Sequence, residues 1–117
     1  MENLTQEERQ RLDWLALFCQ LPPLATDVLQ TLLTFEKQRS GRRWLALRTS
    51  SALLASAEGD WNRLTAPLFA LREWGIARVS LQPEPEVMLC ERIAGFLLGA
   101  APFMLYTGED ASPRGNA

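Results

Sequence analysis

Hydrophobic residues recur at helical spacing along most of the chain and alternate in a strand-like way in a few short stretches. Between residues 60 and 74, one apolar face is formed by Leu64, Leu68, Leu71 and Trp74. Gly75 follows at once, in the position where a left-handed residue ends many helices. Residues 76–80 (Ile-Ala-Arg-Val-Ser) then have the pattern expected at the start of a strand. This stretch therefore predicts a helix, a glycine stop and a strand.

The first helix is marked by a capping box. Thr5 and Glu8 are three residues apart, so each side chain can accept a hydrogen bond from the other residue's backbone amide. We expect this helix to run from about residue 6 to about residue 20. Its second half, residues 14–19, is apolar on nearly every side. Such a helix end has to be covered, either by its own domain or by a partner such as a second copy.

A second helix is expected to begin at a cap formed by Thr26 and Asp27 and to end near Arg39. Its inner stripe is Val28, Leu29, Leu32, Leu33 and Phe35. Residues 43–48 then alternate like a short strand. A short helix from residue 51 to about 57 follows, with Thr49 or Ser50 as its cap.

Pro67 leaves two interpretations of the next helix open. The helix either begins at Asp60 and kinks at the proline, or begins at Thr65, where a proline in the first turn costs no hydrogen bond. In the second case residues 61–63 form a turn. Those are the positions from which a DNA-binding helix would present side chains to the bases.

A β-hairpin is expected from residues 76–81 and 87–92. Its inward face would be formed by Val79, Leu81, Val87 and Leu89. The connecting residues carry Glu84 and Glu86 and no Lys or Arg, so the tip would repel phosphate. Residues 93–106 carry no charge and have to be covered by the first helix, by a partner or by both. Residues 107–117 are expected to form a disordered tail.

The helix, glycine stop and strand resemble the recognition helix and first wing strand of a winged helix-turn-helix domain. The resemblance rests on the spacing of Leu68, Leu71, Gly75 and Ile76. It implies a mainly α fold with a small β-hairpin (α+β), here with an additional N-terminal helix, in one domain over residues 1–106.

Composition narrows the possible chemistry. The 117 residues are 47% hydrophobic and 22% charged, which suits one soluble domain. There is no histidine, and Cys19 and Cys90 lack metal-type spacing, so we expect no metal site, no cofactor and buried free thiols in a reducing cytoplasm. No apolar run is long enough for a membrane span, and no catalytic motif is present. We therefore expect a cytoplasmic protein that is not an enzyme.

One hypothesis is a DNA-binding regulator, expected to be a homodimer. The chain has one basic cluster, in which Arg42, Arg43 and Arg48 would contact phosphates. The base edges of duplex DNA would be reached by Asn62, Arg63 and Thr65.

The alternative is a winged-helix protein–protein interaction module, acting as a subunit or adaptor of a larger complex. The net charge of −2, the acidic hairpin tip and Pro67 favour it. The aromatic side chains that would form its protein interface are Trp14, Phe18, Trp61, Phe96 and Phe103.

Overall fold

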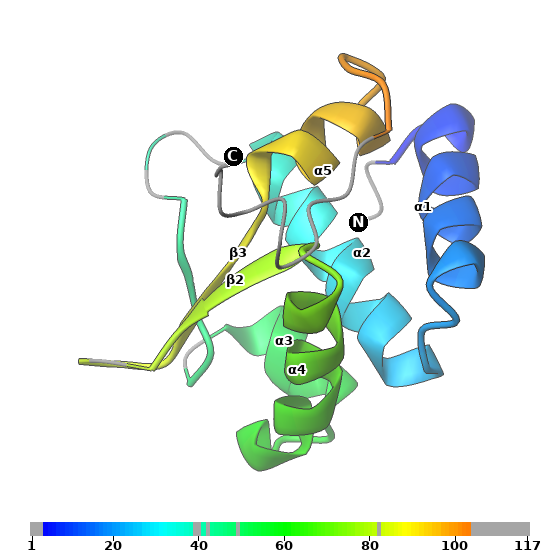
Figure 1. Ribbon diagram of the computed structural model, residues 1–117. Coiled ribbons are helices and arrows are strands. Elements are labelled where there is room, and N and C mark those ends of the chain that lie inside the picture. The colour runs from blue at the N-terminus through cyan, green and yellow to red at the C-terminus, as the bar shows by residue number, and fades with distance from the viewer. Residues whose placement is uncertain (1–3, 39–40, 42, 49, 82, 104–117) are drawn as a thin grey trace, which may run out of the picture.

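The computed structural model describes residues 4–38, 41, 43–48, 50–81 and 83–103 (Figure 1). This part of the chain is mixed α+β. Its elements are α1 (Gln6–Phe18), α2 (Pro23–Gln38), β1 (Leu45–Ala46), α3 (Ser51–Ser56), the 3-10 helix η1 (Trp61–Leu64), α4 (Thr65–Glu73), β2 (Ala77–Ser80), β3 (Glu86–Leu89) and α5 (Glu91–Leu97). Arg42 and the predicted tail at residues 107–117 lie outside the described residues.

The predicted capping box of α1 is confirmed. The Glu8 carboxylate accepts from the Thr5 amide at 2.9 Å, and the Thr5 hydroxyl accepts from the Glu8 amide at 3.1 Å. The same carboxylate accepts from Lys37 Nζ at 2.7 Å, which ties the start of α1 to the end of α2. The helix ends at Phe18, two residues earlier than predicted, and Gln20 has a left-handed φ of 53°.

The predicted start of α2 at Thr26 and Asp27 is wrong. The helix begins at Pro23, where the missing amide is one that a helix start leaves unpaired in any case. The Thr26 hydroxyl donates to the Pro22 carbonyl at 3.3 Å instead of capping a new helix.

The apolar stripe of α2 forms the centre of the core. Its four most buried large side chains are each at most 1% exposed: Val28, Leu29, Leu32 and Leu33. Phe35, which was also expected in the stripe, is half-buried. Helix α2 contacts α1, α3, α4, α5 and β3, so most of the described elements pack on this one helix.

The three strands form an antiparallel sheet in the order β1-β3-β2. The β2–β3 hairpin projects away from the helices (Figure 1). Val87 and Leu89 face the core as predicted, whereas Leu81 is 59% exposed and does not. Leu81 lies beyond the last strand pair, Ser80 with Glu86, where no core element covers the hairpin.

The second interpretation of Pro67 is confirmed. The Asp60 carboxylate accepts from the Asn62 amide at 3.1 Å and caps η1. Helix α4 starts at Thr65, so Pro67 is its third residue, in the first turn, where a helix has no amide bond to lose. Pro67 is buried and costs the helix nothing there.

Gly75 ends α4 with a φ of 74°, as predicted. Its amide donates to the Arg72 carbonyl at 3.0 Å, and the Ile76 amide donates to the Leu71 carbonyl at 2.9 Å. Ile76 is fully buried. This turn directs the chain from α4 straight into β2.

The segment that carries no charge, residues 93–106, is covered in part by α1 over its described residues. Helix α5 packs on α1 and α2, and Arg11 Nε donates to the Leu97 carbonyl at the end of α5 at 2.9 Å. Gly99 follows with a φ of 83°, and an added Cβ there would lie 2.9 Å from the Arg11 guanidinium. The left-handed Gly99 is incompatible with a continued helix, and Arg11 pairs with one of the carbonyls that the end of α5 leaves open.

We expect Gly75→Val to lower the free energy of unfolding by about 1–3 kcal/mol, because valine is strained in the left-handed conformation. Urea denaturation measures the loss. Gly41→Val is the matched control, since Gly41 does not have a left-handed φ and an added Cβ meets no atom within 4 Å. Equal stability of the Gly75 variant and the native chain would contradict this role for Gly75.

Glu8 should make stability depend on pH. Burial raises the pKa of Glu8, but the hydrogen bonds from Lys37 and from the Thr5 amide outweigh burial, so the pKa lies below its ordinary value of 4.5. A lowered folded-state pKa contributes stability that is present above the unfolded pKa and is lost as pH falls through the folded pKa.

We therefore expect Glu8→Gln to be less stable than the native chain near pH 7, and the difference to shrink near pH 3. Denaturant unfolding at both pH values measures it. Glu7→Gln, an exposed carboxylate in the same helical turn, is the control. A stability difference between Glu8→Gln and the native chain that does not change with pH would contradict the assignment.

Candidate functional site

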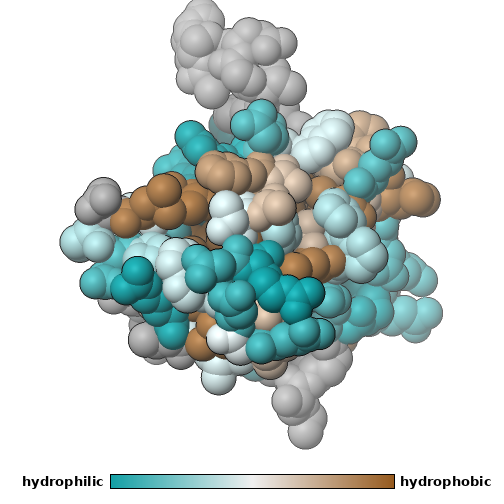
Figure 2. All heavy atoms as spheres, turned by 90° about the horizontal axis from the view of Figure 1, so that it is seen from below, coloured by the Kyte–Doolittle hydropathy of each residue, from teal (hydrophilic) through white to brown (hydrophobic). Residues whose placement is uncertain are grey.

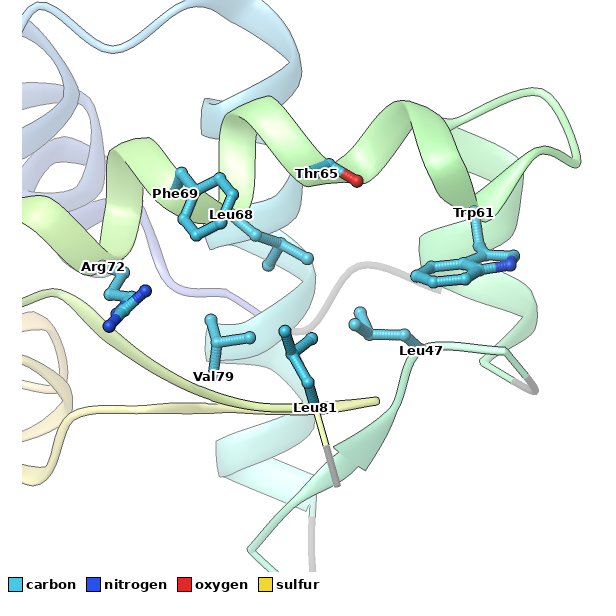
Figure 3. Close-up of a pocket in the computed structure, with 8 residues that line it drawn as sticks. All are labelled: Leu47, Trp61, Thr65, Leu68, Phe69, Arg72, Val79 and Leu81. Atoms are coloured by element: carbon cyan, nitrogen blue, oxygen red, sulfur yellow. The ribbon is translucent and has the colours of Figure 1, made fainter. Parts of the chain in front are cut away.

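A groove with a volume of about 420 Å³ lies between α4 and β2 (Figure 3). It is lined by Leu47, Trp61, Thr65, Leu68, Phe69, Arg72, Val79 and Leu81. Figure 3 shows the side chains of Leu68 and Phe69 on one side and those of Val79 and Leu81 on the other, pointing into the same space. Arg72 lies at one end and Trp61 at the other.

The periodicities of the two elements explain the lining. Thr65, Phe69 and Arg72 are four and three residues apart and share one face of α4. Val79 and Leu81 are two residues apart and share one face of the β2 strand and its extension. Phe69 is 45% exposed and Leu81 is 59% exposed, so both walls present large apolar side chains to solvent.

Two arginines stack on the aromatic rings of the groove. The Arg72 guanidinium carbon lies 5.8 Å from the centre of the Phe69 ring, and that of Arg48 lies 5.1 Å from the centre of the Trp61 ring. Both distances fit cation–π stacking. The groove is therefore apolar along its length, with Arg72 at one end and Arg48, which also lies near Glu84, beside the other.

The arginines expected to contact phosphates face carboxylates. Arg43 is hydrogen-bonded to Glu91 and lies 3.6 Å from Glu36. The hydrogen bond to Glu91 is the main cause of the raised pKa of Arg43. Arg48 lies 3.9 Å from Glu84 on the hairpin, while Arg42 is outside the described residues.

The three residues expected to read base edges lie on two consecutive elements, η1 and α4. Asn62 and Arg63 are exposed on η1, and Arg63 forms an ion pair with Glu58. Thr65 is exposed too, but it lines the groove. Trp61, expected at a protein interface, also lies in the groove and is half-buried.

A second cluster of rings lies around α1, and we call it the aromatic surface. Its neighbouring ring centres are 4.9 to 6.2 Å apart, and its members are Trp14, Phe18, Trp74, Phe96 and Phe103. Trp14 is 45% exposed and Phe18 is 51% exposed. Four of the five were expected at an interface. Trp74 was expected on the inner face of its helix, but it follows the last residue of α4 and is 38% exposed.

The groove as a whole was not predicted. Leu47, Phe69 and Leu81 come from three separate segments, and Arg72 had no assigned role. One wall of the groove could have been predicted from the sequence. Phe69 and Arg72 follow Thr65 by four and seven residues, which puts all three on one helical face.

Hydrophobic and hydrophilic side chains are segregated on the face seen from below (Figure 2). Hydrophobic side chains form a band across this face, and many of the hydrophilic side chains lie to one side of the band. The groove and the aromatic surface are built from different residues.

Within the described ranges, no group of three or more Cys, Asp or Glu side chains is placed to hold a metal ion. Among the helices that the structure describes, none combines the length and the apolar character needed to cross a membrane. No known protein family, curated protein or solved structure matches the chain.

Proposed function

We propose that the chain is a winged-helix interaction module that binds a partner protein through the face formed by α4 and β2. The observation that carries this proposal is the apolar groove on that face, with Phe69 and Leu81 exposed on its two walls. The element order, the β1-β3-β2 sheet and the positive φ of Gly75 support the winged-helix assignment.

The charges near this face support a protein partner over DNA. A winged helix that binds DNA uses the helix and the hairpin corresponding to α4 and β2–β3, and these need cations for the phosphates. Here the hairpin carries Glu84 and Glu86, and Arg43 is hydrogen-bonded to Glu91. The large exposed apolar side chains on this face favour a partner that removes them from water.

Duplex DNA is the second candidate. It is favoured by Asn62 and Arg63, which are exposed immediately before α4. The Arg63–Glu58 pair is exposed on both sides, and such a pair is weak enough for Arg63 to exchange its carboxylate for a phosphate.

A titration with random duplex DNA at low and moderate salt separates the two candidates. We expect the chain to show no salt-dependent affinity for the duplex. DNA binding would instead weaken with salt, Arg43→Ala would reduce the slope of that dependence by about one, and Arg63→Ala would cost roughly 1–3 kcal/mol on a specific site. Those results together would replace the interaction module with a DNA-binding protein.

The aromatic surface supports a homodimer as part of the same proposal. Trp14, Leu17 and Phe18 are exposed at helical spacing on α1, so the helix presents an uncharged face to a second copy. A dimer through this surface leaves the groove, which is built from other residues, open for the partner.

We expect Phe18→Asp to convert the dimer into a folded monomer, because the substitution puts a charge into the apolar interface. Sedimentation velocity measures the change, and circular dichroism checks the fold. Ala52→Asp adds the same charge to an exposed position of α3, which contributes no residue to the aromatic surface, and should leave the dimer intact. A native chain that sediments as a monomer at micromolar concentration would rule out the dimer.

A further inference from the structure

The dimensions of the groove suit a short peptide segment. Thr65 and Arg72 are seven residues apart on one face of α4, which corresponds to about 10 Å along the helix axis. The volume of about 420 Å³ falls in the range of roughly 300–1,000 Å³ typical of small-ligand pockets. A few large side chains fill such a space, and the rest of the segment remains outside it.

The two ends of the groove select the charge of that segment. Among the described residues Arg72 has no ion pair with a carboxylate, and its guanidinium is held against the Phe69 ring. At the other end Arg48 stacks on Trp61 and lies 3.9 Å from Glu84. The side chains of that pair are 57% and 67% exposed, so the pair is weak and its arginine can turn to another acceptor.

We propose that the groove binds an acidic amphipathic segment of a partner protein. Two or three large apolar side chains of the segment enter the groove between Phe69 and Leu81. Asp or Glu side chains beside them pair with Arg72 and Arg48, whose planar guanidinium groups match carboxylates. This inference rests on the proposed function and adds the chemical class of the partner.

Designed helical peptides test the selection of charge. The first carries Leu, Phe and Trp on one face and Glu on the other, the second has Lys in place of every Glu, and the third has Ser in place of the apolar residues. Fluorescence anisotropy of labelled peptide measures binding to the full chain. We expect the Glu peptide to bind, the Lys peptide to bind at least about tenfold more weakly, and the Ser peptide not to bind.

Variants of the chain locate the binding. Phe69→Ala should lower the affinity for the Glu peptide about tenfold, because the substitution removes an exposed apolar side chain that anchors the peptide in the groove. Arg72→Glu should lower the affinity for the Glu peptide by a similar factor and reverse the preference between the Glu and Lys peptides. Glu84→Gln should raise the affinity for the Glu peptide about twofold, because the carboxylate that competes for Arg48 is lost.

Arg78→Glu is the matched control for Arg72→Glu. Arg78 is exposed on β2 next to Val79, so its side chain leaves the opposite face of the strand. The charge change is the same, and the peptide affinity should fall by much less. Circular dichroism and urea denaturation verify that each variant is folded.

Each contrary result has a defined meaning. Equal binding of the Glu and Lys peptides, or unchanged affinity in folded Arg72→Glu, would overturn the acidic partner and leave the interaction module standing. Failure of the native, folded chain to bind the Glu peptide would overturn the inference as well. Displacement of a bound Glu peptide by random duplex DNA would overturn both the inference and the proposed function.

Discussion

Burial of the apolar stripe of α2 is the interaction on which the other elements depend. Leu29, Leu32 and Leu33 are almost completely buried, and each such side chain contributes about 1.5–3 kcal/mol relative to leaving it exposed. Since α4 and β3 both pack on α2, the core fixes the position of α4 relative to the sheet. The two walls of the groove are therefore held from behind, and their outer side chains remain available to a partner.

Local signals in the sequence predicted local structure well. The capping box at Thr5 and the left-handed Gly75 each depend on a few neighbouring residues, so their geometry follows from residue type and spacing. The predicted start of α2 was wrong because two helix-start signals lie close together. Pro23 precedes Thr26, which has the residue type of a helix cap, and the helix begins at the proline. The exposure of Leu81 was missed because alternation alone does not show where the core beneath a hairpin ends.

The groove and the charge pairs depend on contacts between distant segments. Arg43 belongs to a basic cluster along the chain, yet Glu91 lies beside it in the fold, 48 residues later. Charge counted along the sequence therefore overstated the positive surface. The sequence placed all the candidate interface aromatics in one group, whereas the fold separates the aromatic surface on α1 from Trp61 in the groove.

The most direct test of the central claim, that the face of α4 and β2 binds protein, is to map amide chemical shifts on the isotope-labelled native chain. Addition of the acidic amphipathic peptide should shift the amides of Phe69 and Val79 and leave that of Phe18 unchanged. Random duplex DNA at low salt should shift none of them. Shifts confined to the aromatic surface with the peptide, or shifts across α4 and the hairpin with DNA, would contradict the claim.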